Sequence, residues 1–194
     1  MPATPAWSVR DVVAHLAGAC ADVLDGRLEG VTTEPWTAAQ VEARRDRTLD
    51  ELIAEWDERS PAVEDRLRQF GEVMGAMVAD VATHEQDLRG ALGRPGARES
   101  AAMDYALQFF VGALDGRLRE QGLALRLRAG DQEWEVGTGD PGATVTAPDA
   151  YALARALIGR RSRSQVGAFD WVGEPAPYLG TFAIFPMSET DQVE

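Results

Sequence analysis

The sequence predicts an α+β protein in which an N-terminal four-helix bundle is followed by a small C-terminal α/β lobe packed on it. Up to residue 120, apolar side chains recur at intervals of three and four, which is the period of helices that bury one face. From Gln121 onward the period changes to two, and glycines and prolines separate short segments, as in strands joined by turns. We therefore expect two domains, residues 1–120 and residues 121–194.

Composition and charge limit the partners that this chain can have. The formal net charge is -13 at pH 7, and nucleic acids and anionic membranes both need clustered cations, so neither is expected as a partner. Cys20 is the single cysteine, which excludes an internal disulfide and fits a reducing cytoplasm. We find no secretory signal and no apolar run long enough to cross a bilayer. The expected protein is cytoplasmic and acts on a small molecule.

The first helix is predicted over residues 9–28, with Ser8 as its N-cap. Its apolar stripe contains Val9, Val12, Val13, Leu16, Cys20, Val23 and Leu24. His15 lies on the flank of that stripe. There it would either be half-exposed and hydrogen-bonded to an aspartate, or point into a cleft between helices.

Two further helical regions are expected before the fourth helix. One is expected from Thr37, and Pro61 should interrupt or kink it because proline has no backbone N–H to donate. The next is expected over residues 72–92, where Gly93 followed by Pro95 is a clear stop signal.

A fourth helix is predicted over residues 99–119 and completes the bundle. The alternating stretch at residues 123–136 predicts a β-hairpin, and residues 144–146 predict a short strand. A helix should begin at Pro148, and residues 182–185 are expected to form the last strand. These segments make a C-terminal region near the lower size limit for an independent core.

One helix combines a carboxylate with an imidazole. Asp80 and His84 are four residues apart, so they lie on one helix face, one turn above the other. His15 is the only other histidine of the chain. If the first and third helices are neighbours, two imidazole nitrogens and one carboxylate can converge on a divalent metal and leave positions open. The alternative is that both histidines make ordinary hydrogen bonds to nearby aspartates; Asp87, for example, could orient His84 without binding metal.

Three stretches, taken together, resemble the mycothiol-dependent maleylpyruvate isomerase family, which belongs to the wider DinB-like metal-binding bundles. They are residues 7–16 (WSVRDVVAHL), residues 80–88 (DVATHEQDL) and residues 159–166 (GRRSRSQV). The third is followed by Trp171 and by residues 175–179 (PAPYL), as in the small C-terminal domain of the family, which is similar to sterol carrier proteins. The resemblance covers nearly the whole chain.

The resemblance implies a site and a reaction. It implies a divalent metal, typically zinc, held by His15, Asp80 and His84, and a thiol cofactor, mycothiol or a similar thiol. Arg160 is the nearest match to an arginine that serves the family's active site. In the isomerase, the thiol adds to maleylpyruvate, the double bond rotates and the thiol leaves to give fumarylpyruvate. The family pattern has glutamate at the position of Asp80, so the carboxylate of this chain has a shorter reach.

Two classes of function follow as hypotheses. One is a metal- and thiol-dependent isomerase or S-transferase that acts on a small electrophile. The other is a non-catalytic protein that binds a metal or a small molecule, and metal-dependent hydrolysis is a lesser alternative. Zinc is the expected metal, although nickel, iron and manganese also accept two histidines and a carboxylate.

Relatives carry a helical segment before Trp7, so a second subunit could cover this edge of the bundle in a homodimer. Arg160 could instead belong to a solvated cluster of arginines.

Overall fold

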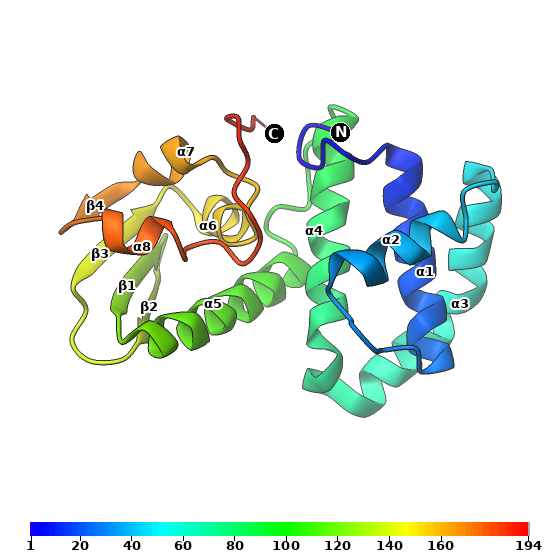
Figure 1. Ribbon diagram of the computed structural model, residues 1–194, viewed down its shortest axis with the longest axis horizontal. Coiled ribbons are helices and arrows are strands. Elements are labelled where there is room, and N and C mark those ends of the chain that lie inside the picture. Colours follow the sequence, from blue (N-terminus) through cyan, green and yellow to red (C-terminus); the bar gives the residue numbers. More distant parts are fainter. Residues whose placement is uncertain (194) are drawn as a thin grey trace. The chain divides into compact units, whose positions relative to one another are not determined.

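The computed structural model describes residues 1–193, except for the side chains of Glu72 and Val73 (Figure 1). Over this range the chain has eight α-helices, a short 3-10 helix and a four-stranded mixed sheet. The N-terminal half is helical and a small α/β region follows, so the predicted α+β class is confirmed. Contacts between residues divide the chain into two compact units, Met1–Met77 and Val78–Glu194.

The first unit is built from helices. They are α1 (Val9–Asp25), α2 (Glu34–Glu42), α3 (Leu49–Phe70) and the 3-10 helix η1 (Gly71–Met74). The predicted cap of α1 is confirmed, because the Ser8 hydroxyl accepts from the backbone N–H of Asp11 and the Asp11 carboxylate accepts from that of Ser8. The helix ends before Gly26, whose φ of 72° lies in the left-handed region that favours glycine.

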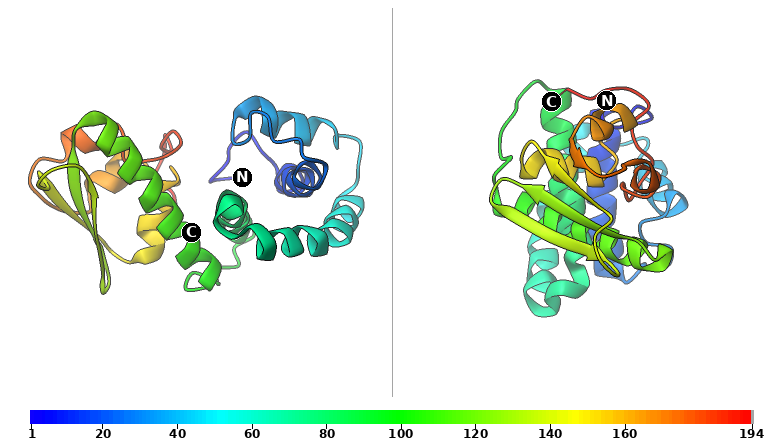
Figure 2. Two further views of the ribbon diagram at one scale, coloured as in Figure 1. Left: turned by 90° about the horizontal axis from the view of Figure 1, so that it is seen from below. Right: turned by 90° about the vertical axis from the view of Figure 1, so that its left-hand side faces the viewer.

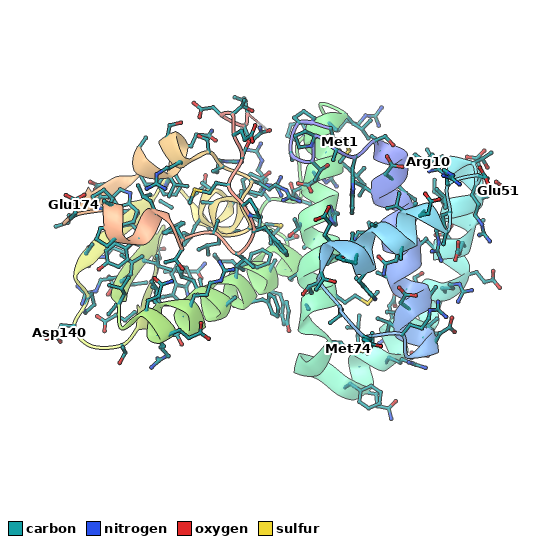
Figure 3. The ribbon with its side chains drawn as sticks, in the orientation of Figure 1. Met1, Arg10, Glu51, Met74, Asp140 and Glu174 are labelled. Carbon is teal, nitrogen blue, oxygen red and sulfur yellow. The ribbon has the colours of Figure 1, made fainter. Side chains whose placement is uncertain are left out.

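The single helical region expected after Thr37 is in fact two helices. The turn between α2 and α3 is held by Arg10, whose guanidinium donates to the backbone carbonyls of Arg44, Arg45 and Arg47. Figure 3 shows Arg10 toward the same end of this unit as the start of α3, where Glu51 is labelled. In a continuous helix these carbonyls would accept from backbone N–H groups one turn later. Here they accept from Arg10 instead, and the chain starts a new helix after the turn.

The predicted interruption at Pro61 is wrong. Proline lies inside α3, which continues from Leu49 to Phe70. Pro61 and Asp57, the residue four positions before it, are both on the exposed face of the helix. Because water can reach the Asp57 carbonyl there, the missing N–H leaves no buried acceptor without a partner.

Close packing between α1 and α2 depends on a glycine. A Cβ added at Gly18 would lie 2.6 Å from Cβ of Gln40 and 2.9 Å from Nη1 of Arg44, which is too close for any side chain. The missing side chain therefore lets α2 approach the middle of α1. On another side, α1 packs on α3 around Val13, Ala14 and Leu52.

The second unit contains the sheet. Its helices are α4 (Gly75–Ala91, whose first three residues belong to the first unit), α5 (Ala101–Gln121), α6 (Ala150–Leu157), α7 (Arg163–Gly167) and α8 (Ala176–Leu179). Its strands are β1 (Ala124–Ala129), β2 (Gln132–Gly137), β3 (Ala143–Ala147) and β4 (Asp170–Val172). The strand order is β2-β1-β3-β4, in which β1 and β3 are parallel and the other pairs antiparallel. Figure 2 shows these strands and α5 from two further directions.

The sheet has an apolar face and a charged face. Leu125, Leu127 and Val145 have no exposed surface and belong to the same core as residues of α5 and α6. On the opposite face Arg126 pairs with Glu135 across the predicted hairpin. This alternation explains why the period-two pattern predicted β1 and β2 correctly. The predicted boundary between residues 120 and 121 falls inside this unit, since α5 contacts β2 and α6.

The predicted last strand is wrong. Residues 182–185 are irregular, and the fourth strand is β4, for which the sequence analysis predicted no strand. Phe182 is fully buried in the core, so its apolar segment fills space between elements without pairing in the sheet.

In the described part of the chain, no helix combines the length and the apolar character that crossing a membrane requires.

Candidate metal centre

The second unit contributes two donors from one helix. Asp80 and His84 lie on successive turns of α4, and His84 Nε2 is 3.5 Å from Asp80 Oδ1. The predicted placement of both side chains on one face is therefore confirmed. The His84 side chain is buried, whereas that of Asp80 is 35% exposed, so one donor is enclosed by protein and the other faces outward.

A third acidic residue orients His84. Asp87 Oδ2 lies 3.0 Å from His84 Nδ1. An ionised carboxylate can only accept, so Nδ1 carries a proton; in the neutral ring the lone pair is then on Nε2, on the side of Asp80. This is the arrangement in which a histidine ring is held ready to bind a metal through its second nitrogen.

Two arginines clamp the Asp87 carboxylate. Arg155 Nη2 is 2.5 Å from Oδ1 and Arg160 Nη2 is 2.9 Å from Oδ2. Arg155 also donates through Nη1 to the backbone carbonyl of Thr83, at 3.3 Å. The Asp87 side chain is wholly buried, so this pairing is what allows a charged carboxylate to remain in the core of the unit.

The clamp also sets the ionisation of Asp87. Burial by itself raises the pKa of this carboxyl, but the hydrogen bond from His84 and the positive charges of Arg155 and Arg160 outweigh it and hold the pKa well below its ordinary value. Asp87 is consequently ionised throughout the physiological pH range. It therefore accepts from His84 at every pH at which the protein would work.

Arg160, the arginine expected to contact substrate or cofactor, lies against Asp87. Its Nε is 3.2 Å from Oδ1, in addition to the bond from Nη2, and only 14% of its side chain is exposed. A contact between Arg160 and a substrate stays a prediction. The neighbouring Arg161 donates through Nη1 to the Arg160 carbonyl, and Arg163 begins α7.

Arg155 was not among the predicted site residues. It lies on α6 and is 1% exposed. A signal for it was present in the sequence, because it stands between Leu153 and Leu157, both of which face the core. A charged side chain at a core position requires a buried partner, although the sequence does not show that the partner is Asp87.

The first unit contributes His15. This side chain of α1 is buried, and its Nδ1 is 2.6 Å from Oε1 of Gln40 on α2. Two indoles flank the ring: the Trp7 centroid is 5.2 Å from the His15 centroid, and that of Trp36 is 6.3 Å away. The sequence predicted an aspartate as the alternative partner of His15 and missed the glutamine, which no local pattern marks.

Gln40 is itself fixed on its other side. Its Nε2 donates to Asp22 Oδ2 at 2.7 Å, and Arg27 approaches Asp22 Oδ1 through Nε and Nη2, both at 2.8 Å. The histidine of this unit is thus supported by a neutral amide, whereas His84 is supported by a charged carboxylate.

His15 of the first unit and Asp80 and His84 of the second are a set of donors that could hold a metal ion. Two imidazole nitrogens and one carboxylate suit zinc, and also iron, nickel and manganese. The donors fit such an ion for a further reason, since the ring of His84 is already oriented by a carboxylate on its other nitrogen. The fold and the donors therefore define an α+β protein with a candidate His/Asp/His metal centre.

Comparisons with protein families, curated proteins and solved structures find no match for this chain.

Proposed function

We propose that this protein is a metal-dependent enzyme that uses a low-molecular-weight thiol, mycothiol or a similar one, as an isomerase or S-transferase acting on a small electrophile. The observation that carries the proposal is the series Asp80, His84 and Asp87 on α4, in which Asp87 fixes the proton on Nδ1 of His84 and leaves Nε2 on the side of Asp80. The resemblance to the maleylpyruvate isomerase family selects the same helix.

Each residue then has a defined task. His15, Asp80 and His84 would hold the ion, for which zinc is the expected metal. A divalent cation lowers the pKa of a bound thiol, so that thiolate becomes available near neutral pH. Two neutral ligands and one carboxylate leave net positive charge at the site, which favours an anionic sulfur or a substrate carboxylate.

The arginine clamp contributes to that charge. Asp87 is an anion directly behind His84 and would by itself weaken the positive field of the ion. Arg155 and Arg160 more than offset it, because two guanidinium groups contact one carboxylate. In this proposal Arg160 also grips a carboxylate of the substrate or the thiol, in the manner typical of arginine.

A specific observation favours a second candidate, a protein that binds a metal or a small molecule without catalysis. Arg160 is engaged by Asp87 through Nε and Nη2, so its guanidinium already has a structural role. An arginine used in this way presents less of its surface to a substrate.

The test combines metal analysis with a thiol reaction. We expect about one zinc per chain in the purified protein and loss of the metal in His84→Ala, while the exposed control Glu133→Gln keeps it. Mycothiol with maleylpyruvate, and mycothiol with a simple electrophile, then test isomerisation and S-transfer. Metal without either reaction would refute the enzyme and leave the binding protein; equal metal in His84→Ala and wild type would refute the metal centre on which the enzyme depends.

A further inference from the structure

The geometry points to Asp22 and Gln40 as a hydrogen-bond relay that decides which nitrogen of His15 can bind a metal. The inference rests on the metal centre proposed above and adds two positioning residues to it. All three residues belong to the unit Met1–Met77, and each step of the relay follows from which groups can donate and which can only accept.

The relay begins at Asp22, near the C-terminal end of α1. Arg27 donates to one carboxylate oxygen, with Nε and Nη2 both at 2.8 Å from Oδ1. The second oxygen, Oδ2, faces Gln40. An ionised carboxylate has no proton to donate, so whatever faces Oδ2 at this distance has to be a donor.

That requirement sets the orientation of the Gln40 amide. Oxygen and nitrogen of a glutamine side chain are exchangeable in shape, and only the partners decide which is which. Because the Asp22 carboxylate can only accept, the Gln40 amide turns its Nε2 toward Asp22, at 2.7 Å from Oδ2. Oε1 of Gln40 then faces His15, at 2.6 Å from Nδ1. An amide oxygen can only accept.

The tautomer of His15 follows. Nδ1 must carry a proton to donate to Oε1, so in the neutral ring the lone pair resides on Nε2. A metal can bind only the nitrogen that has the lone pair. Asp22 therefore acts on the metal site from two hydrogen bonds away, through the orientation of an amide.

The packing holds the backbone and Cβ of Gln40 in place, so the orientation of its amide is left to its hydrogen-bond partners. Gln40 is 3% exposed, its backbone carbonyl accepts from Arg44 Nη1 at 3.2 Å, and its Cβ lies where any side chain at position 18 would collide. On its outer side Gln40 lines a cavity of about 390 Å³ together with Asp22, Arg27 and Arg44. Truncation of the Gln40 side chain would extend that cavity to His15.

The relay gives the two histidines different chemistry. His84 donates to a charged carboxylate, whereas His15 donates to a neutral amide. A neutral support orients the ring without adding negative charge. The proposed site thereby keeps more of the positive charge that an anionic thiol or substrate requires.

The test reads the tautomer directly and needs no activity. Long-range ¹H–¹⁵N spectra above neutral pH report the protonation of each imidazole nitrogen, and the chain has only two histidines, so His84→Asn assigns His15. In wild type we expect a protonated, hydrogen-bonded Nδ1. In Asp22→Asn the new amide can donate as well as accept, so Gln40 can turn over and His15 should show a mixture of tautomers.

Asp25→Asn is the matched control, because Asp25 also pairs with Arg27, Nη1 to Oδ2 at 2.5 Å, and lies in the same helix. It should leave the tautomer unchanged. Gln40→Ala should lower zinc affinity about 10- to 100-fold, and acetamide should restore part of it by entering the enlarged cavity. A wild-type Nδ1 without a proton, or a tautomer and zinc affinity in Asp22→Asn equal to wild type, would overturn the relay. If the relay variants change the tautomer as expected but wild type binds no zinc, the relay stands and the proposed metal function fails.

Discussion

Replacing Asp87 by alanine should destabilise the second unit by about 3–5 kcal/mol, the usual result of removing one partner from a buried ion pair. The reason is the charge left behind. Arg155 is 1% exposed and cannot be solvated where it lies, whereas Arg160 is 14% exposed and can turn toward water. We therefore expect the cost of one stranded charge and not of two.

Urea unfolding followed by circular dichroism measures this loss. The exposed pair Arg128–Glu133 provides the control, since both side chains are 46% exposed and Glu133→Ala should therefore cost far less than Asp87→Ala. A second variant, Asp87→Ala with Arg155→Met, removes the stranded charge and should recover much of the loss. If Asp87→Ala costs no more than the control, the buried clamp does not stabilise the unit and the reasoning fails.

Three further predictions concern the first unit. Burial raises the pKa of Glu55, but its hydrogen bond to Arg44 and the charges of three nearby arginines outweigh burial and lower the pKa below its ordinary value. The depressed pKa stabilises the folded state above about pH 4.5, and this stabilisation is lost as the pH falls through the folded-state pKa. Glu55→Gln should therefore flatten that part of the pH dependence of the unfolding free energy, measured by urea unfolding. Gly18→Ala should lower the melting temperature, because the added methyl overpacks the α1–α2 contact by about 1–3 kcal/mol. Cobalt binding at His15 should quench tryptophan fluorescence. Replacing both flanking indoles, Trp7→Phe with Trp36→Phe, should remove most of that quenching, since their rings are 5.2 and 6.3 Å from the imidazole; undiminished quenching in the double variant would place the metal elsewhere.

Local patterns predicted much of the fold. Ser8 marked the start of α1, and the alternation of Leu125 and Leu127 with arginines marked β1, because capping and burial on one sheet face are decided within a few residues. The predicted interruption at Pro61 did not occur, because helix breaking depends on whether the freed carbonyl reaches water. The prediction at Phe182 failed because an apolar run can fill the core without pairing.

In the candidate site, too, the sequence predicted what local spacing decides and missed the contacts between distant parts of the chain. Asp80, His84 and Asp87 lie within two turns of one helix, so their spacing alone places them together. The other supports come from distant parts of the chain. Gln40 is 25 residues from its histidine and Arg155 is 68 residues from its carboxylate, and no periodicity carries that information. The sequence could predict only that a buried charge or a buried ring needs a hydrogen-bond partner, and not which residue supplies it.

The arginine clamp also has a consequence for the order of events during synthesis. Asp87 leaves the ribosome well before the two cations that hold it, which follow 68 and 73 residues later. Until they emerge, the carboxylate has no reason to leave water, and His84 has no fixed acceptor. The helix that bears the candidate ligands therefore matures only after Arg160 has emerged, so that any ion would be captured after the sheet strands β1 to β3 have been synthesised.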